Sequence, residues 1–133
     1  PARYRDSLVE RSEGRLVVTV DRADRCLLIY PLPDWEEIER KLMRLPTLNP
    51  QARRLQRLMV GHATDLEFDS HGRVLVPPKL REYAGLTRQA MLIGQGSRFE
   101  LWDEQHWNER RDAWLQAGEE PGELPAELGQ LSL

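Results

Sequence analysis

The hydrophobic and polar residues of this chain alternate with a period of two in several short segments. Leu66 and Phe68 alternate with acidic residues, as expected for a half-buried strand, and Val74 and Val76 repeat the pattern after a short break. Similar alternation or short apolar runs occur at four other places. The pattern therefore predicts six strands, over residues 14–20, 26–30, 65–69, 74–76, 91–93 and 99–102.

Helical periodicity separates the two groups of strands. Asp34, with Glu37 three residues later, predicts a capping box at the start of a helix that Pro46 ends. Asn49-Pro50 predicts the start of a second helix. The residues expected to face the core are Trp35, Ile38, Leu42 and Leu45, followed by Ala52, Leu55, Leu58, Met59 and His62. The opposite side of the second helix, expected to be solvated or to face another subunit, carries Arg53, Arg54 and Arg57.

Three further helices are expected. Two are short, over residues 3–8 and 79–84, and Gly85 is a suitable stop for the second. Asp103 is expected to cap the third, which carries Trp107, Trp114 and Leu115. After residue 118 the sequence is acidic and contains Pro and Gly, so we expect a loosely ordered tail.

The segment Asp69-Ser70-His71-Gly72-Arg73 joins two of the predicted strands. Asp69 can accept hydrogen bonds from nearby backbone N–H groups, and Gly72 can adopt a left-handed conformation, so both are expected to shape the loop. Arg73 would then project from the rim of a hairpin, where it could contact phosphates or read guanine. The other reading is that Arg73 pairs with Asp69 across its own turn.

The chain contains two copies of one pattern. Residues 1–6 match residues 77–82 at an offset of 76, and residues 27–30 with Trp35 match residues 99–102 with Trp107 at an offset of 72. Each copy reads as a hairpin with an Arg, a short helix, two strands and a longer helix. The matched aromatic residues are expected to serve core or subunit packing: Tyr30, Trp35, Trp102 and Trp107.

These motifs resemble those of a known family. The second copy, D-x-x-G-R-V-L-V-P-P-x-L-R, resembles the signature of MraZ proteins, bacterial regulators built from two AbrB-like (SpoVT-like) halves. Other segments similar to that family, in a resemblance that runs from Pro1 to about Trp114, are residues 26–35, 54–57, 61–63 and 99–103. The family also carries a D-x-x-G-R strand before the first short helix, and we expect that strand to lie before Pro1.

The resemblance implies an α+β fold in which the two halves form one swapped-hairpin (double-split) β-barrel. An inserted helical hairpin and a C-terminal helix would complete it. The expected organisation is a first AbrB-like half over 1–35, a helical connection over 36–63, a second half with its C-terminal helix over 64–117, and an acidic tail over 118–133.

Composition is that of an ordinary globular chain: 133 residues, of which 40% are hydrophobic and 31% charged. No apolar run approaches the length of a membrane span, and no signal-peptide pattern is present. The single cysteine, Cys26, lies in an apolar run and is expected to be a buried small hydrophobe in a reducing cytoplasm. We expect no cofactor and no membrane partner.

The net charge of −3 is unevenly distributed. Residues 1–102 contain 17 Lys and Arg against 14 Asp and Glu, whereas residues 103–133 contain two bases against eight acids. The body is therefore mildly basic and the C-terminal part acidic. Binding to phosphates needs only a local basic patch, so this balance is compatible with DNA binding.

Motifs for catalysis or metal binding are not evident. The three histidines, His62, His71 and His106, are far apart and show no i, i+4 pairing. No H-E-x-x-H, C-x-x-C, phosphate-binding Gly-rich loop or G-x-S-x-G pattern is present. We therefore expect neither an enzyme nor a metal site, and no small-molecule substrate.

The resemblance implies a sequence-specific transcriptional regulator, a repressor, that binds short direct repeats in its own promoter within the division and cell-wall gene cluster. The implied partners are double-stranded DNA and further copies of the chain in a ring, and the implied location is the cytoplasm, at the nucleoid. The expected DNA contacts are Arg73, Lys79, Arg81, Arg3 and Arg5. The alternative is an oligomeric interaction scaffold that has no specific DNA binding.

Overall fold

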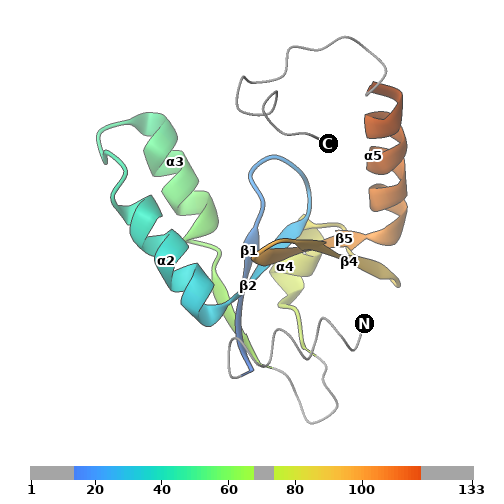
Figure 1. Cartoon of the computed structure of the whole chain (residues 1–133), viewed down its shortest axis with the longest axis horizontal. Helices are drawn as coiled ribbons and strands as arrows, with labels where there is room; N and C mark the ends of the chain where they lie inside the picture. Colours follow the sequence, from blue (N-terminus) through green and yellow to red (C-terminus); the bar gives the residue numbers. More distant parts are fainter. Residues whose placement is uncertain (1–13, 68–73, 118–133) are drawn as a thin grey trace.

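The computed structural model describes residues 14–67 and 74–117, which form an α+β fold (Figure 1). Five antiparallel strands make one sheet in the order β3-β1-β2-β5-β4. In chain order the elements are β1 (Arg15–Val20), β2 (Leu27–Pro31), α2 (Leu32–Met43), α3 (Pro50–Met59), β3 (Thr64–Glu67), α4 (Pro78–Tyr83), β4 (Ala90–Gln95), β5 (Arg98–Asp103) and α5 (Glu104–Ala117). In these described residues, no helix is long and apolar enough to cross a membrane.

The described strands form an open sheet, so the expected swapped-hairpin barrel is not confirmed. The prediction of a strand over 74–76 is wrong: these residues pair with no strand in the described part of the chain. Val74 and Val76 are half-buried and pack against the core, whereas Leu75 is 81% exposed. The alternation of the sequence therefore reflects packing on a core and not membership of the sheet.

The two halves of the chain meet at the centre of the sheet. β2 pairs with β5, and Leu28 lies opposite Glu100, its counterpart 72 positions later. The flanking pairs are Leu27 with Leu101 and Ile29 with Phe99. The counterpart of Leu27 in the second copy is Phe99 and that of Ile29 is Leu101, so the repeat converts each of these two pairs into the other. The sheet therefore has an approximate two-fold axis between Leu28 and Glu100, and the internal repeat seen in the sequence is built into its register.

Two hydrophobic clusters cover opposite faces of β1 and β2. On one face, Leu16, Val18 and Val20 pack with Leu80 and Ala84 at and beside α4. On the other face, residues of β1 and β2 pack with α2 and α3, through Val17, Leu28, Tyr30, Trp35, Leu42 and Met59. Because both faces are covered, residues 16–20 and 27–31 are all buried, and the alternation in the sequence does not mark a solvent-facing side.

One buried polar group joins these layers. Thr19 is fully buried, and its hydroxyl donates a 2.6 Å hydrogen bond to the backbone carbonyl of Met59, the last residue of α3. The bond satisfies both the hydroxyl and a carbonyl at the end of the helix. It also fixes the end of α3 against the C-terminal end of β1.

The helix boundaries match most of the expected signals. Asn49 caps α3, since its side chain accepts hydrogen bonds from the N–H groups of Gln51 and Ala52 at 2.8 and 3.2 Å. The predicted capping box at Asp34 is wrong, because α2 begins at Leu32 with Pro31 as its cap, and Asp34 lies in the first turn. The prediction that His62 faces the core is also wrong, since α3 ends at Met59 and His62 is exposed.

Candidate nucleic-acid interface

Helix α4 presents two of the predicted DNA-contacting residues. Leu80 is only 4% exposed and fixes the helix to the sheet, as does Ala84 just after its end. Lys79 and Arg81 flank Leu80 and are both exposed. Successive residues of a helix are separated by about 100° around its axis. Because Leu80 faces the sheet, Lys79 and Arg81 lie at opposite edges of the exposed side of α4.

Both ends of α4 are well defined. Pro77 is the N-cap and Pro78 the first helical residue, where proline has the right φ and no N–H is needed. At the other end, Gly85 has φ +65°, its N–H bonds to the carbonyl of Glu82, and the N–H of Leu86 bonds to the carbonyl of Arg81. This is the Schellman arrangement, and it confirms Gly85 as the stop. The six-residue helix is therefore a short, sharply bounded element.

The turn between β1 and β2 holds the end of α4. The Tyr83 hydroxyl donates a 2.9 Å hydrogen bond to the backbone carbonyl of Asp21. Burial raises the pKa of the phenol, and the negative charge of Asp21 raises it further, so Tyr83 stays a neutral donor. In return, Nε of Arg25 donates to the Tyr83 carbonyl at 3.3 Å, which places an exposed cation at the C-terminal end of α4.

Arg25 is a candidate contact that sequence reasoning missed. It is exposed and lies 58 positions before its hydrogen-bond partner in the chain. The bond is to a backbone carbonyl, which any residue could supply, so no sequence motif announces it. With Lys79 and Arg81, Arg25 gives the α4 surface three cations, which the carboxylate of exposed Glu82 partly offsets.

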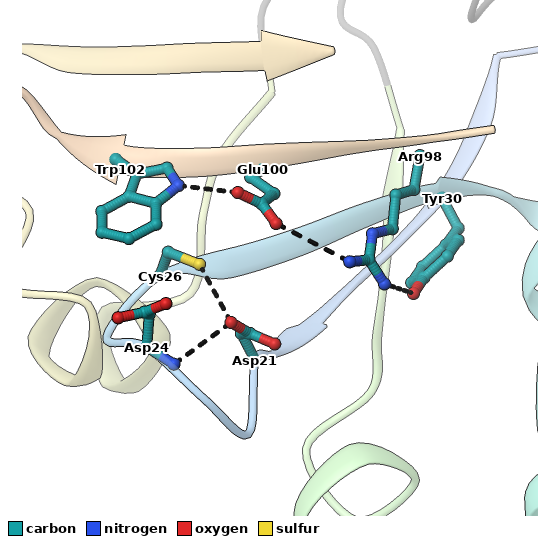
Figure 2. A network of polar contacts seen from close by, with 7 residues as sticks. All are labelled: Asp21, Asp24, Cys26, Tyr30, Arg98, Glu100 and Trp102. Atoms are coloured by element: carbon teal, nitrogen blue, oxygen red, sulfur yellow. Dashed lines mark hydrogen bonds and ion pairs between the residues drawn. The ribbon is translucent and has the colours of Figure 1, made fainter. Parts of the chain in front are cut away.

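The same turn is organised by a carboxylate (Figure 2). Oδ2 of Asp21 accepts hydrogen bonds from the backbone N–H of Asp24 at 3.2 Å and from Sγ of Cys26 at 3.6 Å. Cys26 is fully buried, as predicted, and burial followed by the charge of Asp21 raises the pKa of its thiol. A protonated, buried thiol is a poor nucleophile and a poor metal ligand, so its role here is packing.

A polar network lies beside this turn, on the sheet face that carries Tyr30 and Trp102 (Figure 2). Glu100 accepts a 3.0 Å hydrogen bond from the Trp102 indole and lies 3.7 Å from the guanidinium of Arg98, which also donates to the Tyr30 hydroxyl at 3.3 Å. Trp35 is buried as well, and Trp107 is half-buried. The prediction that the repeated aromatics serve packing is thus consistent with where they lie.

The structure brings together only some of the predicted contacts. Lys79 and Arg81 share α4, whereas Arg3, Arg5, Asp69, Gly72 and Arg73 lie outside the described residues. Arg53, Arg54 and Arg57 are exposed on α3, which covers the opposite face of the sheet from α4. They therefore belong to a different surface. In the part of the chain described, no three His, Cys, Asp or Glu residues are grouped so as to hold a metal ion.

Comparison with known families adds to this geometry. The sequence profile of the family described as "MraZ protein, putative antitoxin-like" matches residues 1–58 and again residues 59–118. This chain belongs to the MraZ family. The two consecutive matches confirm the internal repeat, and together they cover both the sheet and the helices packed on it.

Curated MraZ proteins are similar along the whole chain. The chain is 58% identical over 134 residues to a protein of Halorhodospira halophila, 58% identical over 133 residues to one of Thioalkalivibrio sulfidiphilus, and 56% identical over 133 residues to one of Pseudomonas aeruginosa. Each alignment covers 100% of this chain and 88% of the relative. All three relatives bear the name Transcriptional regulator MraZ.

Proposed function

We propose that this MraZ-family chain is a sequence-specific DNA-binding transcriptional repressor of the division and cell-wall gene cluster. It binds short direct repeats in its own promoter as a homo-oligomeric ring, in the cytoplasm and at the nucleoid. The observation that carries the proposal is the similarity, over 100% of the chain, to proteins named transcriptional regulators. The chemistry is binding and not catalysis.

The α4 surface supports this proposal. Lys79 and Arg81 are exposed on a helix whose position is fixed by Leu80 and by the Tyr83–Asp21 hydrogen bond. Exposed cations on a rigid element can contact phosphates at a defined spacing, which positions a protein on DNA. Arg73 precedes this helix by five residues and is the residue proposed to read bases, with Asp69 and Gly72 shaping its loop and Arg3 and Arg5 supplying equivalent phosphate contacts from the first copy.

Oligomerisation is part of the proposal because each chain offers only a few contacts to DNA. A few Lys and Arg contacts bind DNA weakly, especially in a protein whose net charge is −3. Linking several copies makes each later contact effectively intramolecular and multiplies these weak sites. Repeated operator sequences are the matching arrangement on the DNA. The proposed functional units are the two AbrB-like halves, over 1–35 and 64–117, joined by residues 36–63.

Fluorescence anisotropy of labelled promoter DNA and of scrambled DNA, at two salt concentrations, tests the proposal. Arg73→Ala is expected to remove the preference for the promoter. Lys79→Ala and Arg81→Ala should weaken binding to both DNAs and each reduce the slope of log affinity against log salt by about 1. Arg44→Ala is the matched control, since Arg44 is exposed just after α2, away from α4.

The scaffold alternative gives the opposite result. Equal and weak binding to both DNAs, unchanged by Arg73→Ala, would reject sequence-specific regulation and leave an oligomeric scaffold. A loss of affinity with Arg44→Ala equal to that with Lys79→Ala would show non-specific attraction to the whole basic body. Size-exclusion chromatography with light scattering on the same samples reports the oligomeric state separately.

A further inference from the structure

A groove of about 490 Å³ lies between α3 and the turn that joins β1 to β2. The contacts that hold α4 are made by other residues of this turn, Asp21 and Arg25. Neither Lys79 nor Arg81, the two predicted DNA contacts that the structure describes, lines it. The lining residues are Arg22 and Ala23 from the turn and Gln51, Arg54, Leu55 and Leu58 from α3.

The charge of this groove is not balanced by the described part of the chain. Arg22 and Arg54 are exposed, and neither makes an ion pair with another described residue. Arg53 and Arg57, also exposed on α3, add to the positive charge nearby. Leu55 and Leu58 are half-buried and form an apolar part of the lining. A complementary ligand therefore carries acidic groups interleaved with aliphatic side chains.

The C-terminal segment of this chain has that composition. Residues 118–133 contain no Lys or Arg and four glutamates, Glu119, Glu120, Glu123 and Glu127. Leu124, Leu128 and Leu131 follow at intervals of four and three residues. Carboxylates paired with guanidinium groups, and leucines against Leu55 and Leu58, would match the groove in both of its properties.

The point where this segment begins lies within reach. An ion pair of 3.0 Å between Arg110 of α5 and Asp24 ties α5 to the same turn that supplies Arg22 and Ala23 to the groove. Ala117 follows Arg110 by seven residues, about 10 Å of helix. The six residues over 118–123 can span roughly 20 Å when extended. A segment tethered this close has a high effective concentration at the groove of its own chain.

We propose that the acidic segment over residues 119–128 binds the groove between α3 and the β1–β2 turn of its own chain. DNA fits the groove less well, because a phosphate backbone gains nothing from Leu55 and Leu58. Occupation by the segment neutralises Arg22 and Arg54 and so lowers non-specific attraction to phosphates. This last consequence alone rests on the proposed DNA-binding function; the binding of the segment does not.

Disulfide trapping in the full-length chain tests the proposal. Ala126→Cys is combined with Gln51→Cys, in the groove, or with Gln95→Cys, an exposed control position on β4. The native Cys26 does not interfere, because it is buried and its raised pKa keeps the thiol protonated. Under mild oxidation, the Gln51 pair is expected to form an intrachain bond about tenfold faster than the Gln95 pair. Equal rates would overturn the proposal.

Charge reversal sharpens the test. Arg22→Glu with Arg54→Glu should reduce trapping at position 51 to the control rate, and adding Glu120→Arg with Glu123→Arg should restore it. Interchain disulfides, seen as dimers on a non-reducing gel, would overturn binding within one chain and indicate a second copy. If the Arg reversal lowers DNA affinity while trapping at 51 equals the control, the groove is a DNA site and the proposal is wrong.

Discussion

The two halves of the molecule place equivalent aromatic residues in equivalent pairs. Tyr30 of β2 packs on Trp35 of α2 with 5.7 Å between ring centroids. Their counterparts 72 positions later, Trp102 of β5 and Trp107 of α5, lie 5.4 Å apart. In both halves, therefore, a strand leads directly into a helix that returns over an aromatic side chain of that strand.

The same helices differ greatly in burial. Leu42 of α2 is 8% exposed, whereas its counterpart Trp114 of α5 is 41% exposed. Helix α3 packs beside α2, and Gln56 of α3 donates a 2.8 Å hydrogen bond to the carbonyl of Leu42. Helix α5 has no buried residue among those described. The repeat thus sets the local geometry, and the element packed over it decides how much is buried.

The largest effect is expected from truncating the matched tryptophans. Trp35→Ala removes a side chain that is only 4% exposed and leaves a cavity, so we expect a loss of about 3–5 kcal/mol in the free energy of unfolding. Trp107→Ala, at a half-buried position, should cost roughly half as much. Urea denaturation followed by far-UV circular dichroism measures both. Equal losses would mean that α5 is as well packed as α2.

A smaller loss is expected at the bond that joins α3 to the first half. Thr19→Val leaves the Met59 carbonyl without its buried donor, which should cost about 1–3 kcal/mol. Thr64→Val is the matched control, because the hydroxyl of Thr64 donates to the carbonyl of His62 in an exposed setting. Its urea midpoint should stay close to that of the unchanged protein; a shift as large as that of Thr19→Val would contradict the importance of burial.

The helix caps of the two halves predict a difference in pH dependence. Asp103 caps α5 through His106, and its counterpart is Pro31, which does not titrate. The hydrogen bond from Thr87 and then the His106 N–H lower the pKa of Asp103 below its ordinary 3.8. Its stabilisation is therefore present above about pH 4 and is lost as the pH falls through the lowered value.

Asp103→Asn should remove this part of the acid sensitivity, which amounts to about 1 kcal/mol for a cap. Urea unfolding between pH 6 and pH 2.5 measures it, with Asp112→Asn as the control because Asp112 is exposed on α5. An unchanged pH profile in Asp103→Asn would show that the cap contributes little to the second half.

The smallest effect is expected at the ion pair that ties α5 to the β1–β2 turn. Arg110 occupies the position equivalent to Ile38, so the second half uses a charge where the first has a half-buried apolar residue. Both partners of the Arg110–Asp24 pair are partly exposed, so Arg110→Ala should cost only about 0.5 kcal/mol, and less at 1 M salt. Thermal unfolding at two salt concentrations checks this; a loss independent of salt would point instead to packing on Trp114, whose ring lies under the Arg110 guanidinium at 4.9 Å.

Local signals in the sequence predicted most elements of the fold. Asn49, Gly85 and, through its bond to His106, Asp103 mark helix ends by bonds to residues at most four positions away, and all three were found where expected. Burial on both faces of β1 was not predicted, because it depends on α3 and α4, which lie far along the chain. The start of α2 was misplaced because Pro33 is compatible with the first helical turn, so the helix begins before Asp34.

The residues of the candidate site also fall into those that local sequence signals mark and those that depend on distant parts of the chain. Lys79 and Arg81 could be singled out because the repeat marks both and the signature marks Arg81, and they do lie exposed on one short helix. Arg25 could not, because its placement depends on a hydrogen bond to a backbone carbonyl 58 positions away. The roles of Arg73, Arg3 and Arg5 stay predictions, to be tested by DNA binding.

The pairing at the centre of the sheet also governs how the chain can fold during synthesis. β2 can pair with β1 at once, but it acquires its second partner only when β5 has emerged, since Leu28 pairs with Glu100. At 5–20 residues per second, a delay of 72 residues is roughly 4 to 14 seconds. Helices α2 and α3 emerge during that interval and can cover one face of β1 and β2, but the free edge of β2 must wait. A ribosome-bound chain stopped before Arg98 should therefore be prone to pairing with another such chain.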